Sequence, residues 1–228
     1  MGLHGLARRY FVQALNLSHV SGDRPLGGKV LALMSHQANF LGEYQEAVDL
    51  ARAAALGAGT AATPRVRAMY AAMEARGLAS MGDKRGCLRT MKAAETSFSQ
   101  GTETEEPDWI GYFDQAELHD ELAHCFTALR APREAERHAN LALGEDPDMH
   151  PRSRTFCRVS LATSYLDAGE IPRACEVAGE ALVAAGRIKS ARVRKYIRVF
   201  DRRLDALGSQ RAISEFRERA RPIVAEAS

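Results

Sequence analysis

A repeated pattern of small and apolar residues runs along the chain. Each copy has a small residue, a small or apolar residue four positions later, and a third member three positions after that. The copies are Ala7/Phe11/Ala14, Ala47/Ala51/Ala54, Cys87/Met91/Ala94, Ala135/Ala139/Ala142 and Ala174/Ala178/Ala181, with a poorer copy at Ala212/Phe216/Arg219. Spacings of four and three place these side chains on one helical face. Small side chains there let a neighbouring helix approach closely, so each copy predicts a packed helix.

The turns between the copies follow a second pattern. The first members of successive copies lie 40, 40, 48, 39 and 38 residues apart, a period typical of stacked helical repeats. Five residues before four of the copies stands a glycine that can end the preceding helix in a left-handed conformation; these are Gly2, Gly42, Gly82 and Gly169. The fourth copy has Arg130 in that place, followed by Pro132, which suits the first turn of a helix.

The segments between these turns show no sustained alternation of apolar and polar residues, the pattern typical of a strand. The predicted fold class is therefore all-α. We predict eleven helices, at residues 3–20, 26–41, 44–56, 65–81, 84–100, 108–129, 132–144, 152–168, 171–185, 188–207 and 209–224. They form antiparallel pairs, in which the first member is termed the A helix and the second the B helix. We expect a single domain over residues 1–228. In it, residues 1–20 form an unpaired helix of a truncated first repeat, and residues 187–228 form basic C-terminal capping helices.

Three of the turns resemble those of tetratricopeptide repeats. They are Leu41-Gly42-Glu43-Tyr44-Gln45-Glu46-Ala47, Met81-Gly82-Asp83 and Ala168-Gly169-Glu170-Ile171-Pro172-Arg173-Ala174. The unit here is longer than the usual ~34 residues of that repeat, so its A helices or linkers are extended. The resemblance implies a right-handed superhelical solenoid of about five to six units.

Six further segments carry a broader resemblance. They are HGLARRYF at 4–11, MSHQA at 34–38, TPRV at 63–66, WIGYFD at 109–114, PRSR at 151–154 and SARVR at 190–194. Together they resemble the tetratricopeptide-repeat C-terminal region of actinobacterial-type, lambda-repressor-like helix-turn-helix transcriptional regulators. This resemblance covers nearly the whole chain and implies a regulatory role. It transfers no catalytic residue, and the helix-turn-helix domain of that family is not found in this sequence, which begins inside a repeat.

The first helix has the pattern of a B helix without an A helix before it. Its apolar residues Leu3, Leu6, Phe11 and Leu15 would then lack cover. We expect this helix either to be weakly held or to pair with another chain, which makes a homodimer one candidate assembly.

Composition narrows the class of partner. Apolar residues make up 46% of the chain and the formal net charge is +2, so no global charge attracts nucleic acid or membrane. No apolar run is long enough to span a membrane, and the start does not resemble a signal peptide. Four scattered cysteines, Cys87, Cys125, Cys157 and Cys175, without zinc spacing indicate reduced thiols and a cytoplasmic location. No metal or other cofactor is predicted.

The inward face of such a stack is normally formed by its A helices, which predicts a ligand-binding groove. When the helical spacing of each B helix is continued back onto the A helix before it, a stripe of residues on each A helix is expected to face inward. The polar members of these stripes are Lys29, His36, Asn39, Arg76, Glu117, Asp120, His124 and Arg194. Their mixed charge suits a peptide or a partner helix. The alternative is that they are ordinary surface residues with a few polar contacts between repeats.

Other candidate sites are weaker. Glu121 and His124 are spaced as an ExxH metal pair, but the second pair that such a site needs is absent. Trp109, Tyr112 and Phe113 form either a binding ledge or core packing. The basic end, residues 186–222, lacks the aromatic residues and motifs of nucleic-acid readers, so no direct nucleic-acid contact is expected. No catalytic motif is present, which argues against an enzyme.

These observations predict a non-catalytic binding or sensor region of a transcriptional regulator. It would bind a peptide, a protein partner or a small ligand in its concave groove. The alternative is a free-standing tetratricopeptide-repeat scaffold that joins other proteins.

Overall fold

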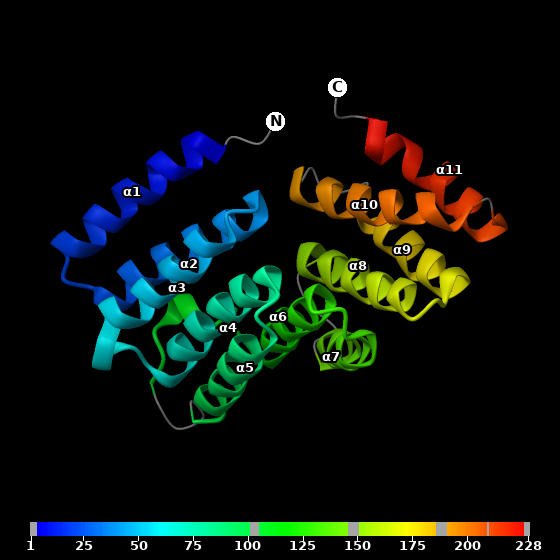
Figure 1. Ribbon diagram of the computed structural model, residues 1–228. Coiled ribbons are helices and arrows are strands. Elements are labelled where there is room, and N and C mark those ends of the chain that lie inside the picture. The colour runs from blue at the N-terminus through cyan, green and yellow to red at the C-terminus, as the bar shows by residue number, and fades with distance from the viewer. Residues whose placement is uncertain (1–3, 101–104, 146–150, 186–190, 209, 226–228) are drawn as a thin grey trace. The chain divides into compact units, whose positions relative to one another are not determined.

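The computed structural model describes residues 4–100, 105–145, 151–185, 191–208 and 210–225. Within these ranges the chain forms eleven α-helices and no strand (Figure 1), which confirms the predicted all-α class. The helices pack into two compact units, residues 3–114 and 115–228. The single domain expected from the repeats stays a prediction.

The first unit contains five α-helices: α1 (His4–Val20), α2 (Arg24–Leu41), α3 (Tyr44–Ala58), α4 (Pro64–Met81) and α5 (Lys84–Ser99). Consecutive helices α2 and α3 pack against each other, as do α4 and α5, and α3 also packs against α4. The two A helices of these pairs, α2 and α4, are in contact, and α1 packs on α2. The predicted helix 1–20 therefore has a neighbour on one side.

The second unit contains six α-helices: α6 (Gln115–Ala128), α7 (Pro132–Glu145), α8 (Pro151–Asp167), α9 (Ile171–Ala185), α10 (Ala191–Leu204) and α11 (Arg211–Ala225). The pairs are α6 with α7 and α8 with α9, and the A helices α6, α8 and α10 contact one another in sequence. Helix α11 packs on α9 and α10. Because Phe200 of α10 and Phe216 of α11 both join the buried apolar cluster of this unit, the C-terminal helices extend its core.

One predicted helix, 108–129, is interrupted. Residues Asp108–Ile110 form a single 3-10 turn, and α6 begins only at Gln115. Ile110 and Phe113 are both fully buried in the first unit, and the ring of Phe113 lies 6.4 Å from that of Phe98 on α5. The Phe113 amide donates to the Ile110 carbonyl at 2.8 Å. The turn brings both apolar side chains into the core. Their burial stabilises the chain more than a continuous helix through Gly111 would.

The repeated small residues lie at helix contacts, as predicted. Every member of the copies beginning at Ala47, Cys87, Ala135 and Ala174 is at most 5% exposed. The first copy differs, because Ala7, Phe11 and Ala14 are only half-buried on α1. In the last copy Phe216 is buried and Arg219 is exposed.

The turns before the B helices confirm the second pattern. Gly42, Gly82 and Gly169 adopt the left-handed conformation, with φ of 92°, 80° and 81°, and Gly2 lies outside the described residues. Arg130 adopts it too, with φ of 57°, although it is not glycine. A residue with a Cβ is strained in this conformation by roughly 1–2 kcal/mol. Contacts of Arg130 with other parts of the fold must therefore offset this strain.

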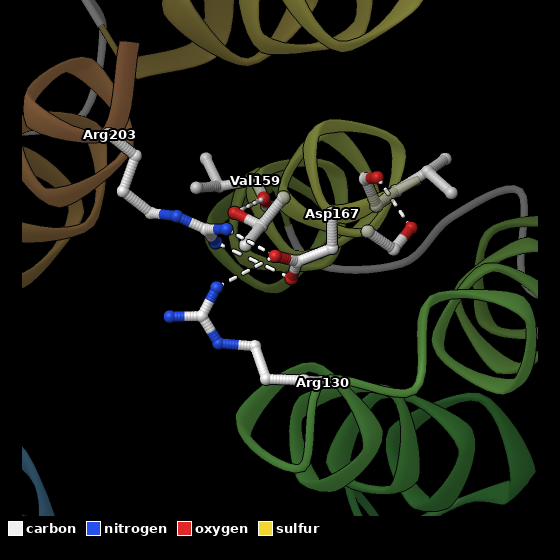
Figure 2. A network of polar contacts seen from close by, with 7 residues as sticks. Arg130, Val159, Asp167 and Arg203 are labelled. Atoms are coloured by element: carbon white, nitrogen blue, oxygen red, sulfur yellow. Dashed lines mark hydrogen bonds and ion pairs between the residues drawn. The ribbon is translucent and has the colours of Figure 1, made fainter. Parts of the chain in front are cut away.

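An ionic cluster around Asp167 supplies that support (Figure 2). Asp167 lies at the end of α8, and its side chain is only 9% exposed. It accepts hydrogen bonds from Arg130 at 2.8 Å and from Arg203 of α10. The carboxylate thus joins the α6–α7 turn, α8 and α10. Beside it, the hydroxyl of Thr163 donates to the carbonyl of Val159 at 2.8 Å within α8.

Candidate functional site

A pocket of about 140 Å³ lies between α1, α2 and α3 in the first unit. Its apolar lining comes from Met34, Ala38, Leu41 and Leu50. Its polar lining comes from His4, Arg8, Gln37, Glu43 and Glu46, with Gly5 beside them. Pockets for drug-sized ligands are larger, about 300–1,000 Å³. This pocket therefore has the size and chemistry to take one apolar side chain.

Polar contacts hold α1 in place beside this pocket. The Arg8 guanidinium pairs with the Glu46 carboxylate of α3 at 3.0 Å. The Gln37 amide of α2 donates to the His4 carbonyl at 3.4 Å, and the His4 ring lies 5.5 Å from that of Phe40. Glycine at position 5 lines the pocket and has no atom within 4 Å of where its Cβ would stand, so a side chain could be added there without a clash.

The pocket uses the face of α2 opposite to the predicted groove stripe. At 100° per residue, Met34, Gln37, Ala38 and Leu41 share one face, while residues 29, 32, 36 and 39 share the other. The predicted stripe follows from the spacing of the B helices alone. The pocket arises instead because α1 packs beside α2 and α3, a contact that the spacing of the repeats does not specify.

The predicted groove residue Lys29 is held by aromatic residues. Its ammonium donates to the Trp109 carbonyl at 3.0 Å and lies 4.7 Å from the centre of the Trp109 ring and 5.3 Å from that of Tyr112. Burial lowers the pKa of Lys29 below its ordinary value. Phe113 is buried and Trp109 is half-buried, while Tyr112 is 49% exposed and contacts Met69. Core packing thus holds for Phe113 and in part for Trp109, and the alternative of a binding ledge stays a prediction.

The other predicted residues of the first unit lie along the same face of the A helices. His36 and Asn39 are half-buried on α2, and Arg76 is buried on α4. The Oδ1 atom of Asn39 is buried and has no hydrogen-bond partner among the described residues. None of the three lines the α1–α3 pocket, so their role in ligand binding stays a prediction.

In the second unit, Asp120 and His124 lie in a buried polar cluster. Both belong to α6, and His124 Nε2 is 3.8 Å from Asp120 Oδ2. His124 Nδ1 is 2.8 Å from the hydroxyl of Ser160 on α8, and the His124 ring contacts Tyr196 of α10 at 5.6 Å. This cluster therefore connects the three A helices of the unit. Asp120 and His124 are predicted groove residues, whereas Ser160 was not predicted, because its neighbours in the chain are apolar.

The acid, imidazole and hydroxyl of this cluster follow the order of a hydrolase triad, but the geometry gives no catalytic assignment. Asp120, His124 and Ser160 are between 3% and 7% exposed, so a substrate cannot reach the hydroxyl. The 3.8 Å separation of acid and imidazole is also longer than a hydrogen bond. Ser160 lies inside α8, where backbone amides are used by the helix and cannot serve an oxyanion. The cluster is a polar contact between α6 and α8.

Next to this cluster, Cys157 of α8 is completely buried. Its thiol donates to the Ala139 carbonyl at 3.4 Å. Burial, and then the negative charge of Asp120, raise the pKa of Cys157. A thiol held protonated in this way is a poor nucleophile. All four cysteines of the chain are buried, as expected from their sequence context.

A second histidine pair joins α6 to α7. The Nδ1 atoms of His119 and His138 are 3.1 Å apart, and the His138 ring stacks on Phe126 at 5.3 Å. Burial, followed by the charges of Arg137 and His119, lowers the pKa of His138 to about 4. His138 is therefore neutral at physiological pH and serves as a packing residue.

The remaining predicted residues of this unit, Glu117 and Arg194, are half-buried. Arg194 lies two positions from Tyr196, so the two side chains point to opposite sides of α10. Tyr196 faces His124, which places Arg194 away from the His124 cluster. The structure consequently brings Asp120 and His124 together but does not add Arg194 to them.

Within the described ranges, no group of three or more histidine, cysteine, aspartate or glutamate residues is placed to hold a metal ion. The helices described are also all too short or too polar to cross a membrane. No protein-family model matches the sequence, and no curated protein matches it either. The function is therefore inferred from the chain itself.

Proposed function

We propose that this chain is a non-catalytic binding protein, built from tetratricopeptide-like helix pairs, that takes an apolar side chain of a peptide or protein partner in the α1–α3 pocket. The pocket is the observation that carries the proposal. Its apolar lining suits an aliphatic or aromatic anchor, and its polar lining offers charges of both signs to the peptide backbone or flanking residues.

The arrangement of the pairs supports the tetratricopeptide-like part of the proposal. In each unit successive A helices contact one another, and each B helix that is followed by another pair contacts the next A helix. This is the pattern of a repeat stack, in which every unit contacts mainly its neighbours. In a solenoid of five to six units with a concave groove, as the resemblance implies, the same contacts would recur from one repeat to the next.

The regulatory role rests on the resemblance of six segments to the repeat region of helix-turn-helix regulators. In that role, partner binding would be passed to a DNA-binding domain. The alternative is a scaffold that joins proteins. An open reading frame in phase with Met1 that encodes a helix-turn-helix would favour the regulator over the scaffold.

The binding proposal is tested by filling the pocket from α1. Because the Cβ of residue 5 meets no atom within 4 Å, Gly5→Leu fits the backbone, and its side chain can occupy the pocket. Replacing a helical glycine should also stabilise α1 by roughly 0.5–1 kcal/mol. Loss of binding in a variant that melts at or above the parent temperature then reports on the pocket and not on folding.

The experiment uses random peptides displayed on phage, selected on the parent chain, with affinities measured by fluorescence polarisation. We expect the selected peptides to share an apolar anchor, and Gly5→Leu to bind them at least tenfold more weakly. Gly57→Leu is the matched control, because Gly57 of α3 is also exposed and unobstructed. Equal binding by Gly5→Leu and the parent would contradict the proposal.

A further inference from the structure

One acidic side chain of the α1–α3 pocket is not neutralised within the described part of the chain. Three residues that carry a full charge line the pocket, namely Arg8, Glu43 and Glu46. Arg8 and Glu46 form an ion pair at 3.0 Å, so their charges cancel. Glu43 is exposed, and its carboxylate has no hydrogen bond or ion pair among the described residues. With His4 neutral, these side chains leave one net negative charge at the pocket, on Glu43.

The acids at the equivalent turns have partners, which makes Glu43 different. An acid follows each of the three glycines that end a helix in the left-handed conformation: Glu43, Asp83 and Glu170. The carboxylate of Asp83 accepts a hydrogen bond from the Gly86 amide at 2.9 Å and caps α5. Glu170 pairs with Arg173 at 3.3 Å. Glu43 stands at the same place before α3 but makes no capping hydrogen bond.

Side-chain length explains this difference from Asp83. Aspartate is a favoured residue at the start of a helix because its short side chain returns to the amides of the first turn, whereas glutamate is not. The additional methylene of Glu43 carries its carboxylate further from the backbone. The carboxylate lines the pocket together with the apolar side chains of Met34, Leu41 and Leu50. The pocket thus combines an apolar lining with an acid that is available to a ligand.

The helix ends at the pocket do not cancel this charge. The pocket is lined by residues at the start of α1, the end of α2 and the start of α3. Each helix end carries about half an elementary charge, positive at a start and negative at an end. Together the three ends leave about half a positive charge, which is smaller than the full negative charge of Glu43. The pocket therefore favours a ligand that carries a positive charge.

We propose that the partner of the α1–α3 pocket is a peptide segment in which a lysine or arginine adjoins the apolar anchor, and that Glu43 selects this basic residue. The inference rests on the proposed function, because the anchor must occupy the pocket. The apolar side chain lies against Met34 and Leu50, while the basic side chain stays at the rim and pairs with the Glu43 carboxylate. An acidic residue beside the anchor is disfavoured, because it would meet a like charge.

The expected selectivity is modest, because Glu43 is exposed. Exposed ion pairs contribute little, and we expect affinities that differ by about threefold between a basic and a neutral neighbour of the anchor. Salt screens such pairs, so the difference should shrink at high ionic strength. The contribution of the apolar anchor should persist there, since it does not depend on charge.

The test uses three acetylated, amidated Gly/Ser peptides that contain one leucine, flanked on both sides by lysine, glutamine or glutamate. Nuclear magnetic resonance titration of the full chain, extended into the millimolar range of weak binding, gives their affinities. We expect the parent to bind the lysine peptide best and the glutamate peptide worst. Glu43→Gln should remove this ranking, and Glu43→Lys should reverse it.

Asp49→Asn is the matched control, because it changes the charge of the chain by the same amount as Glu43→Gln. Asp49 is exposed on the same helix, bonds to Gln45 at 3.0 Å and does not line the pocket. This variant should keep the ranking of the parent. A ranking that depends on salt but disappears equally in Asp49→Asn and Glu43→Gln would assign the selectivity to the overall charge and overturn the inference.

The outcomes separate this inference from the pocket proposal. If Gly5→Leu weakens the binding of all three peptides but Glu43→Gln ranks them like the parent, the pocket proposal stands and the role of Glu43 is wrong. If Gly5→Leu binds all three peptides like the parent, the pocket proposal is wrong, and this inference is overturned with it.

Discussion

The two units build similar helix pairs but stabilise them by different means. In the first unit, pairs approach closely where glycine replaces a side chain. In the second unit, buried acidic and histidine side chains lie between the helices: Asp120, Glu121, His124 and His138 are all less than 10% exposed. Among the Asp, Glu, His, Lys and Arg residues in the described part of the first unit, only Arg76 is buried. The same repeated spacing can thus be stabilised by steric fit or by polar contacts.

Glycine 28 shows the steric fit of the first unit. A Cβ at this residue would lie 2.2 Å from the Tyr70 hydroxyl oxygen and 3.1 Å from the Ala54 carbonyl oxygen. Tyr70 is buried, and its hydroxyl donates to the Pro25 carbonyl at 2.7 Å. Burial raises the pKa of Tyr70, so the hydroxyl stays protonated and the hydrogen bond persists. Gly28 therefore makes room for the aromatic ring that joins α2, α3 and α4.

The largest effect is expected from Gly28→Val. The added side chain must displace Tyr70 or the α3 backbone, and overpacking of this kind costs roughly 3 kcal/mol of unfolding free energy. Chemical denaturation measures the loss, and hydrogen exchange in the full chain should locate it in α2–α4. Gly57→Val, at an exposed helical glycine of α3, should cost well under half as much. Equal losses in the two variants would show that close approach at Gly28 is not required.

A smaller effect, confined to the second unit, is expected from Asp167→Ala. The change removes the acceptor of Arg130 and Arg203 (Figure 2) and leaves Arg130 in a left-handed conformation without its ion pair. The carboxylate is mostly buried but both arginines are partly exposed. The expected loss is therefore about 2 kcal/mol, between the values for exposed and buried pairs.

Denaturant unfolding, with hydrogen exchange at α8 and α10, measures this loss. Arg211→Ala is the control, because it removes an exposed pair with Glu215 and should leave the stability almost unchanged. If Asp167→Ala costs no more than this control, the ionic cluster does not stabilise the second unit.

The smallest effect is a pH dependence of the second unit. Burial lowers the pKa of His138 to about 4, below the ~6.5 of an unfolded histidine. The unfolded chain therefore binds a proton first, and the stability from neutral His138 is complete above pH 6.5 and decreases as the pH falls toward 4. Between pH 7.5 and pH 5.5, we expect a loss of roughly 1 kcal/mol.

Hydrogen exchange at α7 in the full chain measures this dependence, with α5 of the first unit as the internal reference. His138→Gln should lose most of the pH dependence over the same interval. A slope that persists in His138→Gln would assign the titration to another group.

Much of the helical structure was predictable, because it depends on local spacing. Ala51 and Ala178 are buried where the four-and-three pattern placed them, and Gly42 and Gly82 end their helices in the predicted conformation. Arg130 was recognised as the residue in a glycine position, and it adopts the glycine conformation. The break before Gln115 was missed, because it results from contacts of Phe113 with a helix distant in sequence.

The candidate site was less predictable, because it depends on which helix covers which face. Asp120 and His124 were identified, yet their partner Ser160 belongs to another pair, 36 residues further on. The α1–α3 pocket uses the opposite face of α2 from the predicted stripe. Gly5 and Glu46 lie in two separate segments that resemble known repeats, and neither segment indicates that the two residues meet. They line one cavity because α1 packs beside α2 and α3.

The sequence by itself determined the helices, their small-residue contacts and the left-handed turns, since each of these follows from the chemistry of neighbouring residues. Only the tertiary structure decided which side of α1 is covered. Phe11 is half-buried, whereas Tyr10, its neighbour in the chain, is exposed. Both residues are aromatic and helical, so their local chemistry is alike. They differ because α2 and α3 contact one side of α1. Which side of a helix is covered depends on how several helices pack together.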